Sequence, residues 1–221
     1  RVKAAPSQFR QKLVAISPLF WLWYALPGED RTGREQRVSG VLERFRWLAI
    51  LLAVLWVIEV ANLITGYALS DGLGLRPRSI SGLWGILFMP LLHGSVSHAV
   101  ANTAPLVILG ALLAVTAQQL VFKASIGIVV LGGVGVWLFG ATAIHVGASG
   151  LIFGWFGFLV TRGVMERQPV PLLVAIGVVL FYGTMIWGVL PGQPGVSWEA
   201  HFFGCGAGVF VAYALSNRSQ I

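Results

Sequence analysis

Long apolar stretches separated by short polar segments are the feature that most constrains how this chain can fold. Six of these stretches are expected to be membrane-spanning helices, at about residues 47–66, 95–117, 124–143, 149–163, 170–190 and 199–215. Hydrophobic residues make up 57% of the chain and charged residues 10%, whereas ordinary soluble domains carry about 25% charged residues. The sequence therefore predicts an all-α, polytopic membrane protein organised as one six-helix bundle.

The chain is expected to divide into three regions. Residues 1–45 are rich in basic side chains and contain a short aromatic run interrupted by a proline, which predicts a cytoplasmic or interfacial segment. Residues 46–216 hold the six expected spans, and residues 217–221 are a short cytoplasmic tail. The loop of residues 67–92 is long and semi-apolar, so we expect part of it to lie in the membrane interface.

Positive charge is concentrated on one side of the expected membrane. Nine of the 15 Lys and Arg residues precede residue 47, and six spans put 13 of the 15 on the amino-terminal side. The positive-inside rule therefore predicts a multi-pass protein of the cytoplasmic membrane with both ends in the cytoplasm. A net charge of +7 distributed in this way does not form a basic face, so nucleic acid is not an expected partner.

Polar side chains inside the apolar stretches are concentrated on three spans. Such side chains are costly in a bilayer, and by default they mark a functional site or a wet cavity. Counting the helix rise from the cytoplasmic end of each span puts Ser149 at about 20 Å, His201 at about 22 Å and Asn102 at about 24 Å from that end. The hydrocarbon core is about 30 Å thick, so the fourth span is expected to begin inside the bilayer, below a polar cavity.

The fourth and sixth spans carry a possible nucleophile and a possible base. Ser149 stands where a loop turns into a helix, and the unpaired first amides of that helix can stabilise an oxyanion. Glycines one turn apart on each span would let the two helices approach closely, which would bring Ser149 to His201. These glycines are Gly150 and Gly154 on the fourth span and Gly204 and Gly208 on the sixth.

The second span offers two hydrogen-bond donors. His98 and Asn102 are four residues apart and share a helical face, so they are expected to supplement the Ser149 amide at an oxyanion. His93 lies off that face and is expected to be a structural residue that ties down the first loop.

Several alternatives stay open. Ser149 could be a helix cap, and His201 could satisfy a buried partner. His145 is a rival base, although we expect it in the outer loop, and Glu199 is expected to be an exposed loop carboxylate. Cys205 is unpaired and is expected to be a small packing residue.

Metal and transport chemistry have little support in the sequence. His93 and His98 lack a third ligand, there is no HExxH element, and both aspartates lie outside the spans, so neither a metal nor a cofactor is expected. Glu59, near the outer end of the first span, is the one acidic residue that a transporter could use, and it has no evident cationic partner.

Three ordered elements resemble the signature of the rhomboid proteases. HGSVSHAVAN at residues 93–102 resembles the family's HxxxxHxxxN, and GASG at residues 147–150 resembles its GxSG. AHFFGCGAG at residues 200–208 is similar to its AHxxGxxxG. The resemblance covers about residues 45–216 and follows the family's order along the expected spans.

The resemblance implies an intramembrane serine endopeptidase that cleaves transmembrane segments of other membrane proteins. It implies an acyl-enzyme mechanism with a Ser149–His201 dyad and no third acid, and an oxyanion hole formed by His98, Asn102 and the Ser149 amide. It also implies that Phe153 packs against the ring of His201. The supporting residues would be His93, Gly147, Gly150, Phe153, Gly204 and Gly208. The alternatives are a catalytically inactive rhomboid-like binding protein and a small transporter that uses the buried histidines.

Overall fold

The computed structural model describes residues 31–192 and 195–216. The expected tail and most of the expected amino-terminal segment therefore lie outside the described residues. Residues 1–43 and 44–221 form two separate compact units, and the fold below concerns the second, with the helix that leads into it. The division into three regions expected from the sequence stays a prediction.

Helices form most of the described backbone. The long helices are α3 (Arg31–Ile64), α6 (Val96–Thr116), α7 (Val121–Phe139), α8 (Ser149–Glu166), α9 (Pro169–Tyr182) and α10 (Trp198–Ser216). The short ones are α4 (Ala68–Leu73), η1 (Ile80–Gly82), α5 (Gly85–Phe88), η2 (Met89–Leu91), η3 (Gln118–Leu120) and η4 (Gly183–Val189). Within the described residues, the extended pairing is limited to one isolated bridge between Leu75 and His145.

The six expected spans fall on the six long helices. In the described part of the chain, four segments are long and apolar enough to cross a membrane: Ser39–Ile64, Val96–Thr116, Gln118–Phe139 and Pro169–Val189. α8 and α10 are less apolar than these four segments, because they contain several glycines and polar residues. The protein is therefore an all-α, multi-pass membrane protein, and its six-span count is not established by helix composition.

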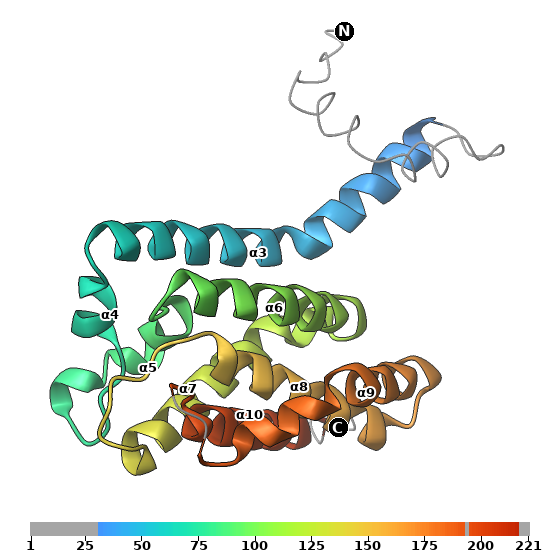
Figure 1. Cartoon of the computed structure of the whole chain (residues 1–221). Coiled ribbons are helices and arrows are strands. Elements are labelled where there is room, and N and C mark those ends of the chain that lie inside the picture. Colours follow the sequence, from blue (N-terminus) through green and yellow to red (C-terminus); the bar gives the residue numbers. More distant parts are fainter. Residues whose placement is uncertain (1–30, 193–194, 217–221) are drawn as a thin grey trace, which may run out of the picture. The chain divides into compact units, whose positions relative to one another are not determined.

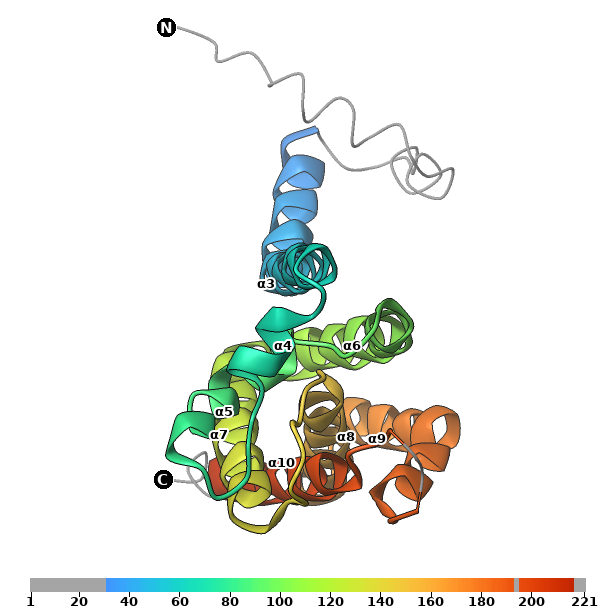
Figure 2. The ribbon, with the colours of Figure 1, turned by 60° about the vertical axis from the view of Figure 1, so that its left-hand side comes forward.

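α8 lies among the other helices and contacts α6, α7, α9 and α10 (Figures 1 and 2). Its side chains are buried for most of its length, and Trp155 and Phe158 are fully buried. A helix that meets protein on its sides needs close packing more than high apolarity, which explains its four glycines. The central position of α8 fixes Ser149, its first residue, inside the bundle.

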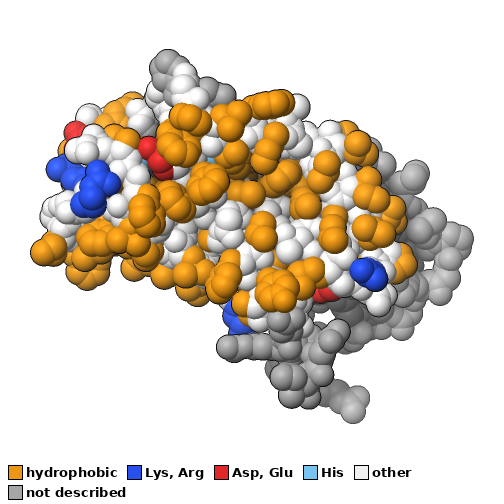
Figure 3. Space-filling model, turned by 90° about the horizontal axis from the view of Figure 1, so that it is seen from below, with side chains coloured by type: hydrophobic (Ala, Val, Ile, Leu, Met, Phe, Trp, Pro, Cys, Tyr) orange, Lys and Arg blue, Asp and Glu red, His pale blue; other side chains and the backbone are white. Residues whose placement is uncertain are grey.

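The outward surface of the bundle is apolar. Hydrophobic side chains cover much of the face in Figure 3, and few charged side chains appear on it. Phe181 on α9 is 83% exposed, and Phe122 and Leu180 are also largely exposed. Apolar exposure on this scale is unfavourable in water and is expected where lipid chains surround the helices.

Glycines set the distance between α8 and α10. A Cβ added to Gly204 would overlap the carbonyl oxygen of Gly150, and one added to Gly208 would overlap that of Gly154. The two contacts advance together along both helices, so α8 and α10 run parallel with their backbones in contact. Their first turns therefore lie side by side.

A polar network joins the end of α3 to the first loop. Asn62 donates from Nδ2 to Ser70 Oγ at 2.7 Å and to the carbonyl oxygen of His93 at 2.9 Å. The Ser70 hydroxyl also donates to that carbonyl at 2.8 Å. All three residues are buried, so these bonds replace the water that the loop backbone would otherwise need.

Candidate active site

Ser149 is the first residue of α8 and is only partly buried. The first helical bond runs from the Ile152 amide to the Ala148 carbonyl at 3.0 Å, so the preceding amides of the helix, that of Ser149 included, are free of helical partners. The described residues offer the Ser149 hydroxyl no hydrogen-bond partner. A partly exposed hydroxyl beside unpaired amides is the arrangement that acyl transfer requires of a nucleophile.

His201 lies in the first turn of α10 and is held by two contacts. Its ring stacks on Phe153, with centroids 4.1 Å apart and planes 7° apart. Its Nδ1 is 2.9 Å from the carbonyl oxygen of Gly188 in η4. A carbonyl can only accept, so Nδ1 carries the proton and the neutral ring keeps the lone pair on Nε2.

Contacts between adjacent residues of α8 and α10 place Ser149 near His201. Phe153 follows Ser149 by one turn on the same face of α8, and its ring supports His201. Gly150 adjoins Ser149, and a Cβ there would lie 3.3 Å from the carbonyl oxygen of Ala200, which adjoins His201. The direct hydroxyl–imidazole bond is not formed among the described residues; such bonds are often long before substrate binds.

His98 faces the start of α8. Gly147 has φ of 126°, and a Cβ there would lie 2.9 Å from His98 Nε2 and 3.6 Å from Ser149 Oγ. A side chain at position 147 would thus overlap the His98 ring, and its Cβ would also contact Ser149. Asn102, one turn along α6, donates from Nδ2 to the His98 carbonyl at 2.9 Å and keeps its second N–H hydrogen.

His93 is fully buried and contacts the segment that leads to Ser149. Its Nε2 accepts from the Ala148 amide at 3.4 Å, which leaves the proton on Nδ1, and its ring packs edge-on against His98 at 5.1 Å. Burial, with a smaller effect of the nearby His98, lowers the pKa of His93 to about 4. His93 is therefore neutral at physiological pH and uses its acceptor nitrogen on the backbone.

His145 was a rival base in the sequence, and its contacts argue against that role. It is buried, its Nε2 is 3.0 Å from the Ala141 carbonyl, and its Nδ1 is 2.6 Å from Ser197 Oγ. Nε2 must donate to the carbonyl, so Nδ1 accepts from the Ser197 hydroxyl and has no free lone pair. His145 thus links the loop before α8 to the start of α10.

The expectation that Glu199 is an exposed loop carboxylate is wrong. Glu199 lies in the first turn of α10, is only 5% exposed, and accepts from the Ala141 amide through Oε1 at 3.0 Å. The loop of residues 140–148, which carries Ala141, packs on it. Together with His145 it joins the two segments that carry Ser149 and His201, a pairing that the sequence pattern did not reveal.

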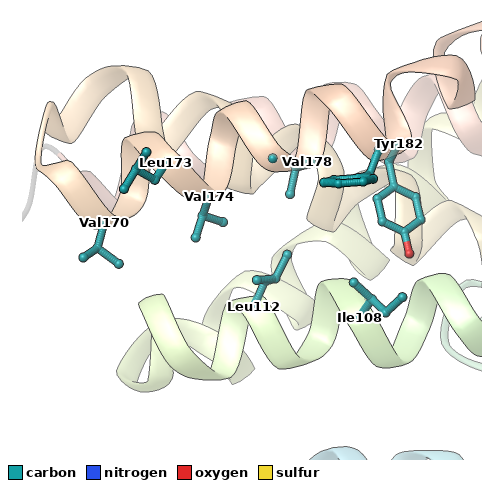
Figure 4. Close-up of a pocket in the computed structure, with 9 residues that line it drawn as sticks. Ile108, Leu112, Val170, Leu173, Val174, Val178 and Tyr182 are labelled. Carbon is teal, nitrogen blue, oxygen red and sulfur yellow. The ribbon is translucent and has the colours of Figure 1, made fainter.

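A separate apolar groove lies between α6 and α9 (Figure 4). It has a volume of about 640 Å³, and Leu112 and Ile108 of α6 face α9 across it, with Tyr182 toward one end (Figure 4). No residue of the candidate site lines it. Its apolar walls suit hydrocarbon, and its α9 wall leads into η4, which contacts His201.

These features define a multi-pass helical membrane protein in which a serine and a histidine lie at the adjoining starts of two parallel helices. Residues 81–218 match the Rhomboid domain family model. The chain is 38% identical over 201 residues to uncharacterized proteins of Mycobacterium bovis (strain ATCC BAA-935 / AF2122/97) and Mycobacterium tuberculosis (strain ATCC 25618 / H37Rv), covering 84% of this chain and 83% of each relative. An uncharacterized protein of Mycobacterium leprae (strain TN) is 36% identical over 188 residues, covering 78% of this chain and 74% of that relative. The chain belongs to the rhomboid family.

The names of these relatives state no activity, and the chemical roles of Ser149, His201, His98 and Asn102 stay predictions. In the described part of the chain, no group of three His, Cys, Asp or Glu residues could hold a metal ion.

Proposed function

We propose that this protein is an intramembrane serine endopeptidase that cleaves transmembrane segments of other membrane proteins. Rhomboid family members are generally such proteases, although some are inactive. The observation that supports activity here is the stack of Phe153 on His201, one helical turn from Ser149, with Nδ1 of His201 engaged and Nε2 free. The ring is thus held beside the helix that Ser149 begins, with a basic nitrogen left without a hydrogen bond, as a general base requires.

In the proposed reaction, Ser149 Oγ attacks a substrate carbonyl while Nε2 of His201 takes the hydroxyl proton. The tetrahedral oxyanion accepts hydrogen bonds from the Ser149 amide, His98 and the remaining N–H of Asn102. Collapse of this intermediate transfers the proton to the leaving amine and gives an acyl-enzyme. Water then attacks the acyl carbon while Nε2 of His201 takes its proton, and collapse of the second tetrahedral intermediate returns that proton to Ser149 Oγ and releases the carboxylic acid product.

The membrane arrangement is part of the proposal. α8 and α10 would complete six spans, with the other four supplied by the long apolar helices, and both chain ends would lie in the cytoplasm. Ser149 would then lie below the outer surface of the cytoplasmic membrane. The groove between α6 and α9 offers an apolar surface for the helix of a substrate.

The test is cleavage in lipid vesicles that contain the purified protein and a model transmembrane substrate. Wild type should cleave and should react with a fluorophosphonate, and Ser149→Ala should lose both activities. Ser125→Ala removes another partly buried serine, on α7, and should keep both. Unchanged cleavage by Ser149→Ala would refute the assigned nucleophile.

Two results would favour the other classes. Substrate binding without cleavage or labelling by wild type would indicate an inactive binding protein. Proton or solute flux that needs Glu59 would indicate a transporter, but Glu59 already accepts from the Tyr67 hydroxyl at 3.2 Å and is only 1% exposed, which suits a structural role.

A further inference from the structure

We propose that the backbone carbonyl of Gly188 is a positioning group for His201, taking the place that the aspartate holds in a Ser-His-Asp catalytic triad. This inference rests on the proposed function for its catalytic meaning, but its structural part can be tested without turnover. Gly188 touches neither substrate nor the reacting atoms, and it acts through the ring of His201.

The first support is the direction of the hydrogen bond. Nδ1 of His201 lies 2.9 Å from the Gly188 oxygen, within the normal range for an N–H donor to a carbonyl. The bond fixes one of two neutral tautomers, the one whose Nε2 can accept a proton from Ser149. In three-membered sites this task falls to an aspartate, which also stabilises the imidazolium.

The second support is that two contacts together fix the ring. Stacking on Phe153 sets the plane of the imidazole, and the bond to Gly188 sets its rotation within that plane. Without the Gly188 contact, the ring could turn over on Phe153 about its Cβ–Cγ bond, which would put a ring carbon where each nitrogen now lies. Only one of these orientations presents a basic nitrogen to Ser149.

The third support is that a side chain at position 188 would disturb both rings. A Cβ there would lie 2.9 Å from Cζ of Phe153 and 3.1 Å from Nδ1 of His201. Both are closer than ordinary contacts of a Cβ, and both atoms belong to the rings whose placement matters. At Gly183, which begins the same 3₁₀ segment, the nearest atom would be Val179 Cγ1 at an ordinary 3.8 Å.

The acid nearest to His201 in sequence is not available for the task. Glu199 precedes it by two residues, and its Oε1 is engaged by the Ala141 amide at 3.0 Å. An ionised carboxylate placed against the His201 ring would also be costly to bury inside a membrane. A backbone carbonyl orients the imidazole without introducing a charge.

The tautomer is tested by ¹⁵N NMR of histidine-labelled full-length protein in detergent micelles. The chain has four histidines, so His201 can be assigned by comparison with His201→Gln. Wild type should show a protonated Nδ1 and an unprotonated Nε2 for neutral His201. Gly188→Ala should show both tautomers, and Gly183→Ala should match wild type.

The kinetic counterpart uses the transmembrane substrate. Gly188→Ala should lower kcat about tenfold or more, because one oriented hydrogen bond contributes roughly this factor, and should change KM less than about threefold. Gly183→Ala should retain wild-type values. A purely structural defect would lower the fraction of active protein, which fluorophosphonate titration measures, without changing the tautomer of the folded fraction.

A backbone ester between residues 188 and 189 provides a variant without added atoms, in case Gly188→Ala does not fold. An ester carbonyl is a weaker acceptor, so this variant should also mix the tautomers and lower kcat. A single unchanged tautomer and unchanged kcat in either folded variant would overturn the proposal. Loss of the proposed function would instead appear as wild type that neither cleaves nor labels while its His201 signal still shows the fixed tautomer.

Discussion

The rings of Phe153 and His201 lie parallel, 4.1 Å apart, although they belong to different helices. The stack depends on the glycine contacts that let α8 and α10 touch, since a wider separation would leave the His201 ring without support. Phe153 in turn is fixed by its position one turn after Ser149. The distance from Ser149 to His201 is thus set by packing rather than by a hydrogen bond between them.

Replacement of Phe153 should therefore reduce activity more than its stability cost predicts. Stacked ring pairs contribute about 0.5–1.5 kcal/mol, so Phe153→Leu should lower kcat up to about tenfold, and Phe153→Tyr should keep most activity. Phe158→Leu removes a similar ring from the same helix, where it is fully buried away from His201. It should lower the melting temperature but not kcat per labelled enzyme. Equal kinetic losses at the two positions would remove the stack from the mechanism.

Asn102 should matter for rate rather than folding. Its side chain makes one bond to a carbonyl four residues earlier, and Thr103 makes the same kind of bond to Ala99 at 2.8 Å. If Asn102 also donates to the oxyanion, Asn102→Ala should lower kcat by about 10²–10³. Thr103→Val, which loses only the local bond, should remain near wild type. Cleavage assays on both variants with matched melting temperatures decide the point.

The links between the 140–148 loop and α10 should hold the site together without taking part in chemistry. His145→Gln or Ser197→Ala breaks a partly buried pair and should reduce stability by about 1–3 kcal/mol. Fluorophosphonate labelling of the folded fraction should persist, because Nδ1 of His145 is already used by Ser197. Complete loss of labelling in folded His145→Gln would instead support His145 as the general base.

The sequence predicted the helices of this site better than the contacts around it. The starts of α6, α8 and α10 could be placed because a polar residue marks each one within an apolar stretch. The Glu199 contact was missed since a helix pattern does not tell which loop folds over a helix end. Gly188 was missed for a similar reason: it lies 13 residues before His201, in a mainly apolar segment, and contributes only its backbone.

Stability should depend on pH through His93, which precedes α6. Its pKa is lowered from 6.5 to about 4 in the folded protein, so the unfolded chain binds a proton in this interval that the folded protein does not. Above pH 6.5, His93 is neutral in both states and does not lower the free energy of unfolding. As the pH falls toward 4, protonation of His93 in the unfolded chain lowers that free energy by up to about 3 kcal/mol. His93→Gln should remove this slope and keep an acceptor for the Ala148 amide. Thermal unfolding of Ser149→Ala protein between pH 4.5 and 7.5, with and without His93→Gln, measures the difference; parallel curves would contradict the assignment.

The glycines of α10 should differ sharply in their tolerance of alanine, although all lie on one helix. Gly204 and Gly208 meet the carbonyl oxygens of Gly150 and Gly154, whereas a Cβ at Gly206 would meet nothing within 4 Å. Gly206→Ala should be neutral or stabilise the helix by up to about 1 kcal/mol, because alanine is the better helix former. Gly204→Ala must push α10 away from α8 within one turn of His201 and should lose both stability and cleavage. Gly208→Ala, a turn further from the site, should lose stability with a smaller fall in kcat of the folded protein. Melting temperature and kcat per labelled enzyme distinguish the three variants. An active, stable Gly204→Ala would mean that contact between the backbones of α8 and α10 is not what places His201 beside Ser149.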